Sequence, residues 1–579
     1  MPNLHTSNVL AKFQKNAFRN VPQSAKPIEL KTKGTIPPWL NGVMYRVGGG
    51  KFQLGEGGTA FTIQHAFDGL PIMHRFEIHG EANKVMYRSR YLADDAEKRI
   101  VASNGRGEIF FGHTIEMSTW GRIKDAVARI RGMSNGASAD ASPSSQPIGV
   151  TVTPNYPVPT SWKTKETSPE ESLMLVSKTD ANMLQKVNRD TLEPEKLFTY
   201  QSYHNELTGP FAPAHQIYDY ETKENLSLTI SVGRNADIKV FSMARDGATK
   251  ILATISHAMD TTQSPVRTFY CHSFFATKNY VVVPESPLFL RNYGLDFLLN
   301  GNIASGLEWD AKTPTRLHVV DRHGGGHLAT FQAPAYFAFH IANGVDWVDD
   351  KGRIHLELDC STYNGDMLYE VNSFGNLVRA SDYDAFLTKQ SQKQTLHNGI
   401  RNPPKHFSSF GDLQRFHVTW HPSTIAKDTS VPVCPSTIAN NIEFMRINTS
   451  LVMKNYTYTY ACRLQPPTES SGERYDLVKV NVHTGDVLTY QQKDLRHGYM
   501  SSEPVFVARP DGTSEDDGVV LSLVSVFDDS GEKQDHCFLL ILDASSFTEL
   551  ATVSVGDFVA PTFHGSFHVE HSFELGSFN

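Results

Sequence analysis

Four histidines that are far apart in the sequence stand in apolar, aromatic surroundings, where an imidazole ring is unexpected. They are His215 in "GPFAPAHQIYDY", His272 in "RTFYCHSFFATKNY", His340 in "APAYFAFHIANG" and His564 in "APTFHGSFH". A single histidine of this kind is more often a hydrogen-bonded core residue than a metal ligand. Four neutral imidazoles that meet at one point would suit a first-row transition metal and leave positions open for a small molecule.

Three acidic residues also occupy apolar settings: Asp180 in "LMLVSKTDANML", Glu443 in "NNIEFMRINTSLV" and Glu503 in "MSSEPVFVARP". A metal-bound imidazole needs its second N–H held by a carboxylate or carbonyl oxygen, which fixes the tautomer of the ring. Each acid could equally be a turn residue or a surface strand residue. The four histidines and three acids together indicate a metal site more strongly than either group does alone.

Short segments of β type must position these residues, because they dominate the chain from about residue 170 onward. Examples are "YVVVPESP", "RIHLELDC" and "VVLSLVSVF", which are separated by turn sequences such as "HTGDVL" and "DDKGR". Long helical patterns are nearly absent, which disfavours a βαβ fold. We therefore predict an all-β propeller, although the sequence shows no clean blade repeat. Strands of different blades converge on the axis of a propeller, where distant histidines could meet.

Length and composition fit this interpretation and exclude some functions. The 579 residues are 40% hydrophobic and 20% charged, and we expect one domain over residues 1–579. Within it we expect an N-terminal extension at residues 1–30 and a flexible, small and polar surface loop at residues 133–147. The 54 basic and 62 acidic residues give a net charge of −8, which argues against a nucleic-acid partner.

The five cysteines are scattered and form no CxxC pair, which disfavours a disulfide framework or a structural zinc site. No secretory signal is visible, and no stretch approaches the roughly 18 apolar residues that a membrane-spanning helix needs. We expect a cytoplasmic protein that is either soluble or peripherally associated with a membrane.

Two segments are candidates for peripheral membrane contact. Residues 121–133, "GRIKDAVARIRGM", place Ile123, Val127 and Ile130 on one helical face, with basic residues around the rest. One interpretation is a surface helix that packs on the body of the protein, and the other is a helix that lies in the plane of a membrane surface. Residues 286–299, "SPLFLRNYGLDFLL", are a second candidate, for contact with a bilayer or an apolar substrate.

Several motifs, in the same order along the chain, resemble those of the carotenoid cleavage oxygenases, a family of non-haem iron enzymes. The segments are "IPPWLNGVMYRVGGGKFQLG", "HAFDGLPIMHRFEI" with "YRSRYL", "CHSFFATKNYVVVPESPL", "SEPVFVARP" and "FHGSF". One departure from the family pattern is Gly49, where proline is usual. The resemblance covers nearly the whole chain and is most similar to the fungal branch. It implies a seven-bladed β-propeller capped by a helical dome, with a tunnel that leads to the iron.

The resemblance also assigns roles to the candidate residues. The four iron(II) ligands of the family fall on His215, His272, His340 and His564, and its three outer carboxylates fall on Asp180, Glu443 and Glu503. Asp180 would support His272, Glu443 would support His340, and Glu503 would support His564. Glutamate is usual at the first of these positions. Because Asp180 is one methylene shorter, we expect its hydrogen bond to be longer or bridged by water.

The family chemistry uses Fe²⁺ and O₂ to break a conjugated C=C bond into two carbonyl products. The chain carries no flavin or nicotinamide fingerprint, so the substrate itself must be an electron-rich alkene. Phe339 and Phe563 stand next to the predicted ligands and suit a flat, apolar polyene, although packing explains these rings equally well. We expect a carotenoid or apocarotenoid substrate, such as torulene or β-carotene.

The alternative substrate within the family is a stilbene or a vinyl phenol. Family members that cleave these phenols have a lysine immediately before the outer carboxylate, where this chain has Thr179. Lys178 comes one residue earlier, and on a strand its side chain would point to the other face. This position favours the carotenoid, with Thr179 as a candidate substrate contact. Some relatives isomerise retinyl esters, which is a further alternative.

Other classes of function must be weighed as well. "DRHGGGHLAT" contains the HGGG of esterase oxyanion holes, and Ser134 in "RGMSNGAS" completes a formal G-x-S-x-G. In a serine hydrolase the HGGG precedes the nucleophile, which follows a buried strand; here it comes later, and Ser134 is expected in a polar loop. A local zinc site of His564, His568 and His571 is also disfavoured, because a strand turns His571 to the other face. A non-catalytic propeller scaffold is the remaining option.

Overall fold

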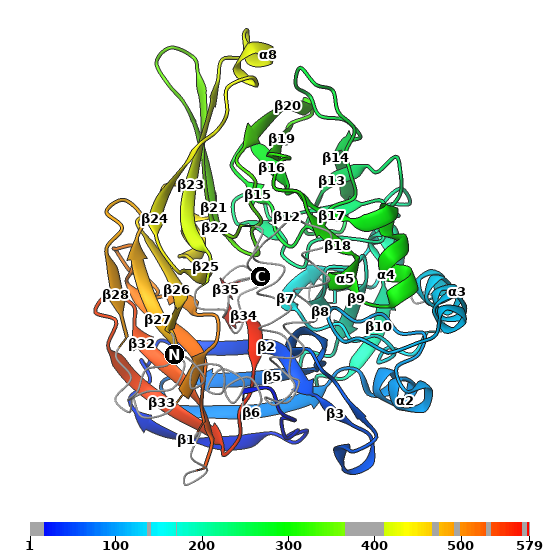
Figure 1. Cartoon of the computed structure of the whole chain (residues 1–579). Coiled ribbons are helices and arrows are strands. Elements are labelled where there is room, and N and C mark those ends of the chain that lie inside the picture. The colour runs from blue at the N-terminus through cyan, green and yellow to red at the C-terminus, as the bar shows by residue number, and fades with distance from the viewer. Residues whose placement is uncertain are drawn as a thin grey trace, which may run out of the picture.

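Antiparallel sheets arranged around one axis make up most of the computed structural model (Figure 1). It describes residues 17–135, 141–168, 171–364, 410–465, 474–490, 498–527, 534–569 and 576–577. These residues form seven blades, which confirms the prediction of an all-β, seven-bladed propeller.

Blades two to five are separate four-stranded sheets. In each of them a strand pairs with the next strand of the same sheet along the chain. Blade two contains β7 (Thr151–Pro157), β8 (Leu173–Lys178), β9 (Leu184–Val187) and β10 (Pro194–Phe198). Blade three contains β11 (Ile217–Asp219), β12 (Glu224–Ile230), β13 (Ile238–Met243) and β14 (Thr249–Ile255). Blade four contains β15 (Phe275–Ala276), β16 (Tyr280–Glu285), β19 (Thr315–Asp321) and β20 (Gly326–Ala333). Blade five contains β21 (Ile341–Val348), β22 (Ile354–Thr362), β23 (Asp412–Trp420) and β24 (Pro435–Ala439).

Blades six and seven follow and are joined to each other. Blade six contains β25 (Glu443–Arg446), β26 (Tyr458–Gln465), β27 (Arg474–Asn481) and β28 (Val487–Thr489). Blade seven contains β30 (Val505–Ala508), β31 (Gly518–Phe527), β32 (His536–Asp543) and β33 (Glu549–Gly556). The short strand β29 (Gly498–Ser501) pairs with both β27 and β31 and so links the two blades.

Both ends of the chain build blade one and close the ring. The late strand β34 (Thr562–Val569) pairs with β2 (Asn41–Lys51), which continues through β5 (Leu70–His79) to β6 (Lys84–Tyr91). The outer strand β1 (Ile28–Gly34) pairs with β6 on one side and with β33 of blade seven on the other. Two seams of backbone hydrogen bonds therefore join the start of the ring to its end. The strand β35 (Gly576–Ser577) pairs with β34.

Burial on both faces explains why several strands have continuous apolar sequences. In β31, "GVVLSLVSVF", side chains such as Val520 and Val524 belong to one buried cluster, and Leu521 and Leu523 belong to another. Each blade is thus packed between its neighbours, and a fully buried side chain of this size contributes about 1.5–3 kcal/mol. The alternation of polar and apolar residues that marks a half-exposed strand is lost here.

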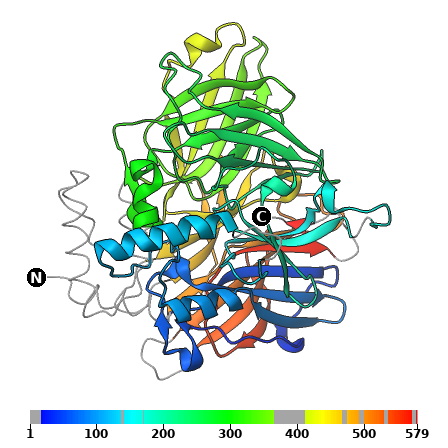
Figure 2. The same ribbon diagram turned by 90° about the vertical axis from the view of Figure 1, so that its right-hand side faces the viewer.

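Helices and short elements lie mostly on one side of the ring (Figure 2). The helices are α2 (Asp94–Ser103), α3 (Thr119–Asn135), α4 (Leu295–Asn300), α5 (Ile303–Gly306) and, at the far tip of blade five, α8 (Ile425–Asp428). Two short hairpins accompany them: β3 (Gln53–Leu54) with β4 (Phe61–Thr62), and β17 (Leu288–Leu290) with β18 (Leu307–Trp309). The 3₁₀ turns are η1 (Glu56–Gly58), η2 (Ala66–Asp68), η3 (Thr160–Trp162), η4 (Tyr200–Ser202), η5 (Arg291–Gly294) and η6 (Thr449–Leu451).

The helix α3 packs on the body of the protein, as one of the two interpretations has it, but its apolar face is turned outward. Trp120, Ile123, Val127 and Ile130 face outward, with exposed fractions of 81%, 45%, 45% and 52%. On the inward side Arg129 is only 2% exposed, because its guanidinium donates hydrogen bonds to the backbone carbonyls of Glu108, Leu298 and Leu299. These carbonyls satisfy a buried charge that the sequence pattern had placed in solvent.

The loop predicted at residues 133–147 is shorter than expected. The helix α3 continues to Asn135, and residues 136–140 lie outside the described residues. After that gap, the Ser144 hydroxyl donates to the Asp95 carboxylate of α2 over 2.9 Å, and Ser142 contacts the same carboxylate. Of the predicted N-terminal extension, residues 1–16 are likewise outside the described residues, while the remainder leads directly into the ring strand β1.

Candidate metal centre

The four histidines identified in the sequence meet on the axis of the propeller. His215, His272 and His340 come just before the inner strands β11, β15 and β21, and His564 lies within β34. One ring nitrogen from each histidine lies within 4.8 Å of the others. The Nε2 atoms of His340 and His564 are 3.3 Å apart. In the part of the chain that the structure describes, this is the one cluster of three or more histidine, cysteine, aspartate or glutamate side chains with such spacing.

Three of the four rings are held from behind by the predicted carboxylates. The His272 Nδ1 lies 2.9 Å from Asp180 Oδ1, and the His564 Nδ1 lies 3.1 Å from Glu503 Oε1. The His340 Nδ1 contacts Glu443 Oε2 in the same way. A carboxylate only accepts, so each Nδ1 carries the proton and each Nε2 presents a lone pair on the other side of the ring. The structure thus brings together all seven residues in the predicted pairs.

Asp180 reaches His272 directly, so the expectation of a longer or water-bridged bond was wrong. The residue lies in the loop between β8 and β9 rather than on an inner strand, and this loop brings the shorter side chain close. Its Oδ1 accepts a hydrogen bond from the Ala214 N–H over 3.1 Å, and its Oδ2 accepts one from the Tyr270 hydroxyl over 2.6 Å. Asp180 therefore connects the segments that carry His215 and His272.

Glu443 is held by a tyrosine and by a strained backbone. Its Oε1 accepts a hydrogen bond from the Tyr363 hydroxyl over 3.1 Å, and its Oε2 accepts one from the Phe444 N–H over 2.6 Å. Phe444 has a φ of 59°, in the left-handed region that costs a residue with a side chain about 1–3 kcal/mol. That conformation aims the Phe444 N–H at the carboxylate and places its ring 5.0 Å from the ring of His340.

Glu503 is a buried carboxylate beside positive charge. The Gly565 N–H donates to its Oε2 over 3.0 Å, and Arg446 Nη1 lies 3.5 Å from its Oε1. The fully buried Arg46 donates to the backbone carbonyls of Glu503 and Phe563. Burial acts to raise the pKa of Glu503, but the charges of Arg446 and His564 outweigh it and lower the pKa to about 2. This carboxylate is therefore ionised at neutral pH.

Two of the four histidines are neutral at pH 7, which is the form that binds a metal. Burial, together with the neighbouring rings, lowers the pKa of His215 well below its usual value. Burial also lowers the pKa of His564 to about 4, although the adjacent Glu503 works in the opposite direction. The rings of His215 and His564 are therefore uncharged before any metal arrives.

Aromatic side chains surround the cluster. The ring of Phe339 meets the edge of His272 at 5.3 Å between centroids, and Phe67 lies 5.8 Å from Phe563 and 6.4 Å from Phe339. Phe339 and Phe563 are both half-buried, and Thr179 is half-buried next to Asp180. The predicted apolar surroundings are present, and the roles of these three residues in binding substrate stay predictions.

Several contributors to the site were not identified from the sequence as such. They are Tyr270, Tyr363 and Phe444, which bond to the carboxylates, and Arg46, Arg446 and Phe67. Arg46 and Phe67 stand inside the motifs "YRVGGG" and "HAFDG", which could have pointed to them. Tyr363 and Phe444 lie in ordinary surroundings, and no pattern marks them.

The structure contradicts the serine hydrolase interpretation. Ser134 lies in the last turn of α3, and the HGGG segment forms the turn between β19 and β20. Neither has the strand-to-helix context that a nucleophile elbow requires. His568 hydrogen-bonds to Asn155 over 3.1 Å, and His571 lies outside the described residues.

A propeller that gathers four histidines on its axis is a metal-binding propeller. Residues 18–569 match the family model described as "Retinal pigment epithelial membrane protein", and the chain belongs to this family. The torulene dioxygenase of Fusarium fujikuroi is 29% identical over 97% of this chain and 95% of its own length. The carotenoid dioxygenase of Neurospora crassa is 26% identical, with 95% and 90% covered. The mouse β,β-carotene 15,15'-dioxygenase is also 26% identical over the same shares.

Solved structures agree with the fold. A mutant of the Synechocystis apocarotenoid oxygenase has a TM-score of 0.66 and 18% identity, and covers 97% of this chain and 99% of its own. The cobalt-substituted form of that enzyme has a TM-score of 0.64, with 96% and 98% covered. The four-histidine cluster itself has the donor set and spacing of a metal site.

Replacing His564 tests the cluster. We expect His564→Ala to bind less than a tenth of the metal that the wild type binds after reconstitution with Fe²⁺. Only three imidazoles remain in this variant, and Glu503 loses its hydrogen bond with His564. Elemental analysis of the desalted protein measures this. His568→Ala, four residues further along the same strand, is the matched control and should keep full occupancy. Full occupancy in His564→Ala would contradict the assignment.

The second prediction concerns the carboxylate behind His272. Asp180→Asn should weaken metal binding about 10–100-fold, because the amide no longer orients and polarises the ring. Tyr270→Phe removes only one bond to Asp180 and should weaken binding less. A competition titration against a chelator ranks the two variants. Equal affinities for Asp180→Asn and the wild type would remove Asp180 from the site.

The third prediction concerns Lys178, which is 1% exposed and whose pKa is lowered by burial to about 7. Its charge also contributes to the lowered pKa of His215. In the unfolded chain Lys178 keeps its proton up to about pH 10.5. Burial of the charged lysine therefore lowers the stability of the folded protein by the full amount below pH 7 and not at all above pH 10.5. Lys178→Met should therefore raise the melting temperature more at pH 6.5 than at pH 9.5. An equal increase in melting temperature at the two pH values would show that the lysine is not desolvated.

Proposed function

We propose that this protein is a non-haem iron(II) dioxygenase that cleaves a conjugated carbon–carbon double bond of a carotenoid or apocarotenoid. The products are two carbonyl compounds, and O₂ supplies their oxygens. The observation that carries the proposal is the meeting of four imidazoles, three of them backed by carboxylates, in a chain similar to torulene and carotenoid dioxygenases over nearly its full length.

The donor set fits iron(II). Imidazole nitrogens suit iron among the first-row metals, and four neutral ligands leave the full charge of the ion and open positions for small molecules. His215, His272, His340 and His564 would hold the ion, which supplies the activation of O₂ toward an electron-rich alkene. Asp180, Glu443 and Glu503 keep the protons on the Nδ1 atoms of their histidines, so that the rings stay in the binding tautomer.

The surrounding side chains would position the substrate and exclude water from the site. Phe339, Phe563 and Phe67 present ring faces and edges next to the histidines, which suits a flat and apolar polyene better than a polar substrate. An aromatic lining also excludes water from reactive intermediates. The enzyme's task is to hold one double bond of the polyene beside the metal.

The substrate class rests on the relatives and on Thr179. Relatives named as torulene, carotenoid and β-carotene dioxygenases share the whole length of the chain. Thr179 occupies the position at which a lysine would serve a phenolic substrate, and its hydroxyl does not offer the charge that a phenol requires. We therefore propose a carotenoid or apocarotenoid rather than a stilbene.

Turnover of the iron(II)-loaded protein tests the function. We expect β-carotene, torulene or a β-apo-carotenal to be consumed together with O₂, and the aldehyde products to be identified by mass. His564→Ala is the inactive control. Cleavage of resveratrol alone would move the substrate to the stilbenes. Conversion without O₂ consumption would indicate an isomerase, and no conversion of any substrate would refute the dioxygenase.

We also propose that the protein rests on a membrane surface, from which an apolar substrate is taken up. The outward side chains of α3 continue to Tyr293 and Leu295, which are 57% and 53% exposed next to α4. Arg122 and Lys124 are exposed on the same helix and suit anionic headgroups. Tyr293 and Leu295 belong to the second candidate segment, whose first part is internal, since Leu288, Phe289 and Leu290 are buried. Within the described residues, no helix has the length and apolar character needed to cross a bilayer.

Vesicle binding tests the membrane proposal. The double variant Ile123→Asp, Val127→Asp should lose at least tenfold in binding to vesicles with anionic lipid, because two charges replace the apolar face. Val431→Asp, at an exposed apolar residue near the tip of blade five, is the matched control and should bind like the wild type. Cosedimentation with vesicles measures both. Unchanged binding of the double variant would place the contact elsewhere.

A further inference from the structure

The outer part of blade five carries a second cluster of imidazoles. Strands β21, β22 and β23 are long and extend past the ring toward α8 (Figure 1). Their register places Trp347 opposite His355, and His355 opposite Thr419. His417 follows in the next row, opposite Glu357. These side chains share one face of the sheet, because residues two apart on a strand point the same way.

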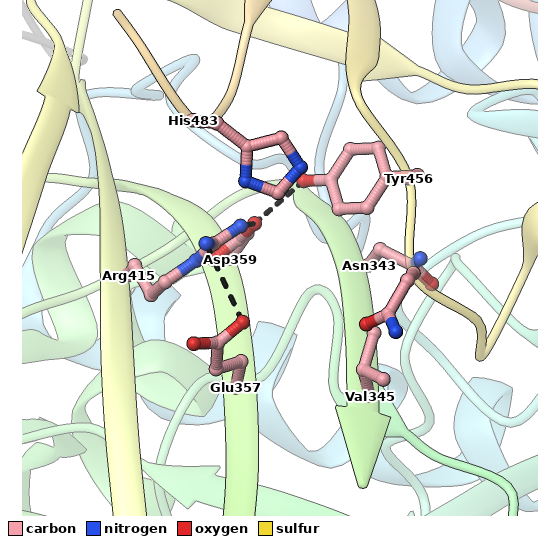
Figure 3. A pocket seen from close by; sticks show the side chains of 8 residues that line it. Asn343, Val345, Glu357, Asp359, Arg415, Tyr456 and His483 are labelled. Atoms are coloured by element: carbon pink, nitrogen blue, oxygen red, sulfur yellow. Dashed lines mark hydrogen bonds and ion pairs between the residues drawn. The ribbon is translucent and has the colours of Figure 1, made fainter.

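The inner part of the same face is a closed network of charges (Figure 3). Arg415 contacts Asp359 over 2.7 Å and Glu357 over 3.4 Å. Blade six covers this part, and from it the Tyr456 hydroxyl donates to Asp359 over 2.6 Å. The charges there satisfy one another, and the pocket they line also contains His483. The outer part of this face differs, because the exposed residues Trp347 and His417 lie there.

Three atoms in the outer part form a small triangle of metal-ligand type. His355 Nδ1 and His417 Nε2 are 3.0 Å apart, and Thr419 Oγ1 lies 3.0 Å from the first nitrogen and 3.3 Å from the second. Ligands about 2.05 Å from one metal ion are roughly 2.9 Å apart at right angles and roughly 3.3 Å apart at tetrahedral angles. The three atoms already have the spacing of neighbouring ligands on one ion.

A carboxylate orients the first ring as it does in metal sites. The Nε2 of His355 lies 3.2 Å from Asp349 Oδ2, so the proton of this ring belongs on Nε2. The Nδ1 then presents its lone pair to His417, which is the arrangement of a ligand supported by an outer carboxylate.

From this geometry we propose that His355 and His417 bind a divalent transition-metal ion of the nickel, copper and zinc class. The Thr419 hydroxyl and water complete the coordination. Imidazole nitrogens select these ions over magnesium or calcium, which prefer oxygen. The site belongs to blade five alone and does not depend on the proposed function of the axial cluster. The ion connects β22 to β23 and holds the exposed tip of the blade together.

Trp347 provides a built-in reporter for this site. Its indole stacks on His355 with 5.0 Å between ring centroids and 5° between planes, and lies 5.8 Å from His417. A paramagnetic ion at the histidine pair would sit within a few ångströms of the indole. Bound Ni²⁺ or Cu²⁺ should therefore quench the fluorescence of this tryptophan.

The experiment uses Ni²⁺ with the protein whose axial site has first been loaded with iron. Equilibrium dialysis with elemental analysis should show one more equivalent of nickel on the wild type than on His417→Asn, and an affinity at least tenfold lower for His355→Asn. Trp347→Phe should bind nickel normally but lose the quenching. His483→Asn, an exposed histidine beside the neighbouring pocket, is the matched control and should behave as the wild type.

Two outcomes would overturn the proposal: equal nickel binding by the wild type and His417→Asn, or no anomalous scattering peak between the two rings in nickel-soaked crystals. Circular dichroism of each variant shows whether it is folded. Turnover of a carotenoid is measured in parallel and should be unchanged in both histidine variants. A failure of carotenoid cleavage would leave the nickel result standing, so the two proposals are tested separately.

Discussion

The site depends on one interaction repeated three times, in which a carboxylate accepts a hydrogen bond from the Nδ1–H of a histidine. Without it a buried imidazole could turn or change tautomer, and the axis of the propeller would hold four uncoordinated rings. The three carboxylates are stabilised differently. Asp180 and Glu443 each accept a hydrogen bond from a tyrosine hydroxyl, while Glu503 lies beside two arginines. The same orientation is thus obtained from local surroundings that have little in common, as expected when each blade contributes its own loop.

Much of the site could be predicted because its chemistry leaves a mark on single residues. A histidine or an acid inside an apolar segment is costly unless something binds it, and that is how His340 and Glu503 stood out. The partners of these residues leave no such mark. Tyr363 looks like an ordinary aromatic residue, and the left-handed backbone of Phe444 depends on the loop around it. Contacts between blades are set by the packing of the ring, which a strand pattern does not encode.

The orientation of α3 shows where pattern reasoning failed for a physical reason. An apolar helical face is usually turned toward the core, and the basic residues around it are assigned to water. Here Arg129 points inward, since three backbone carbonyls surround its guanidinium. Two of those carbonyls belong to residues 169 and 170 positions away, so their effect on the helix appears only in the folded chain. Likewise, Asp180 reaches its histidine from the loop after β8, and the path of that loop is set by the fold rather than by the local sequence pattern.

The pairing of β34 with β2 has a consequence for how the protein is made. Synthesis begins at the N-terminus, and domains fold as their residues emerge. Blade one cannot be completed until its last strand has left the ribosome, because β34 is contributed by the far end of the chain. His564 arrives with that strand. The four-histidine centre is therefore completed only once β34 has emerged, and a nascent chain that still lacks this strand cannot acquire a complete metal site.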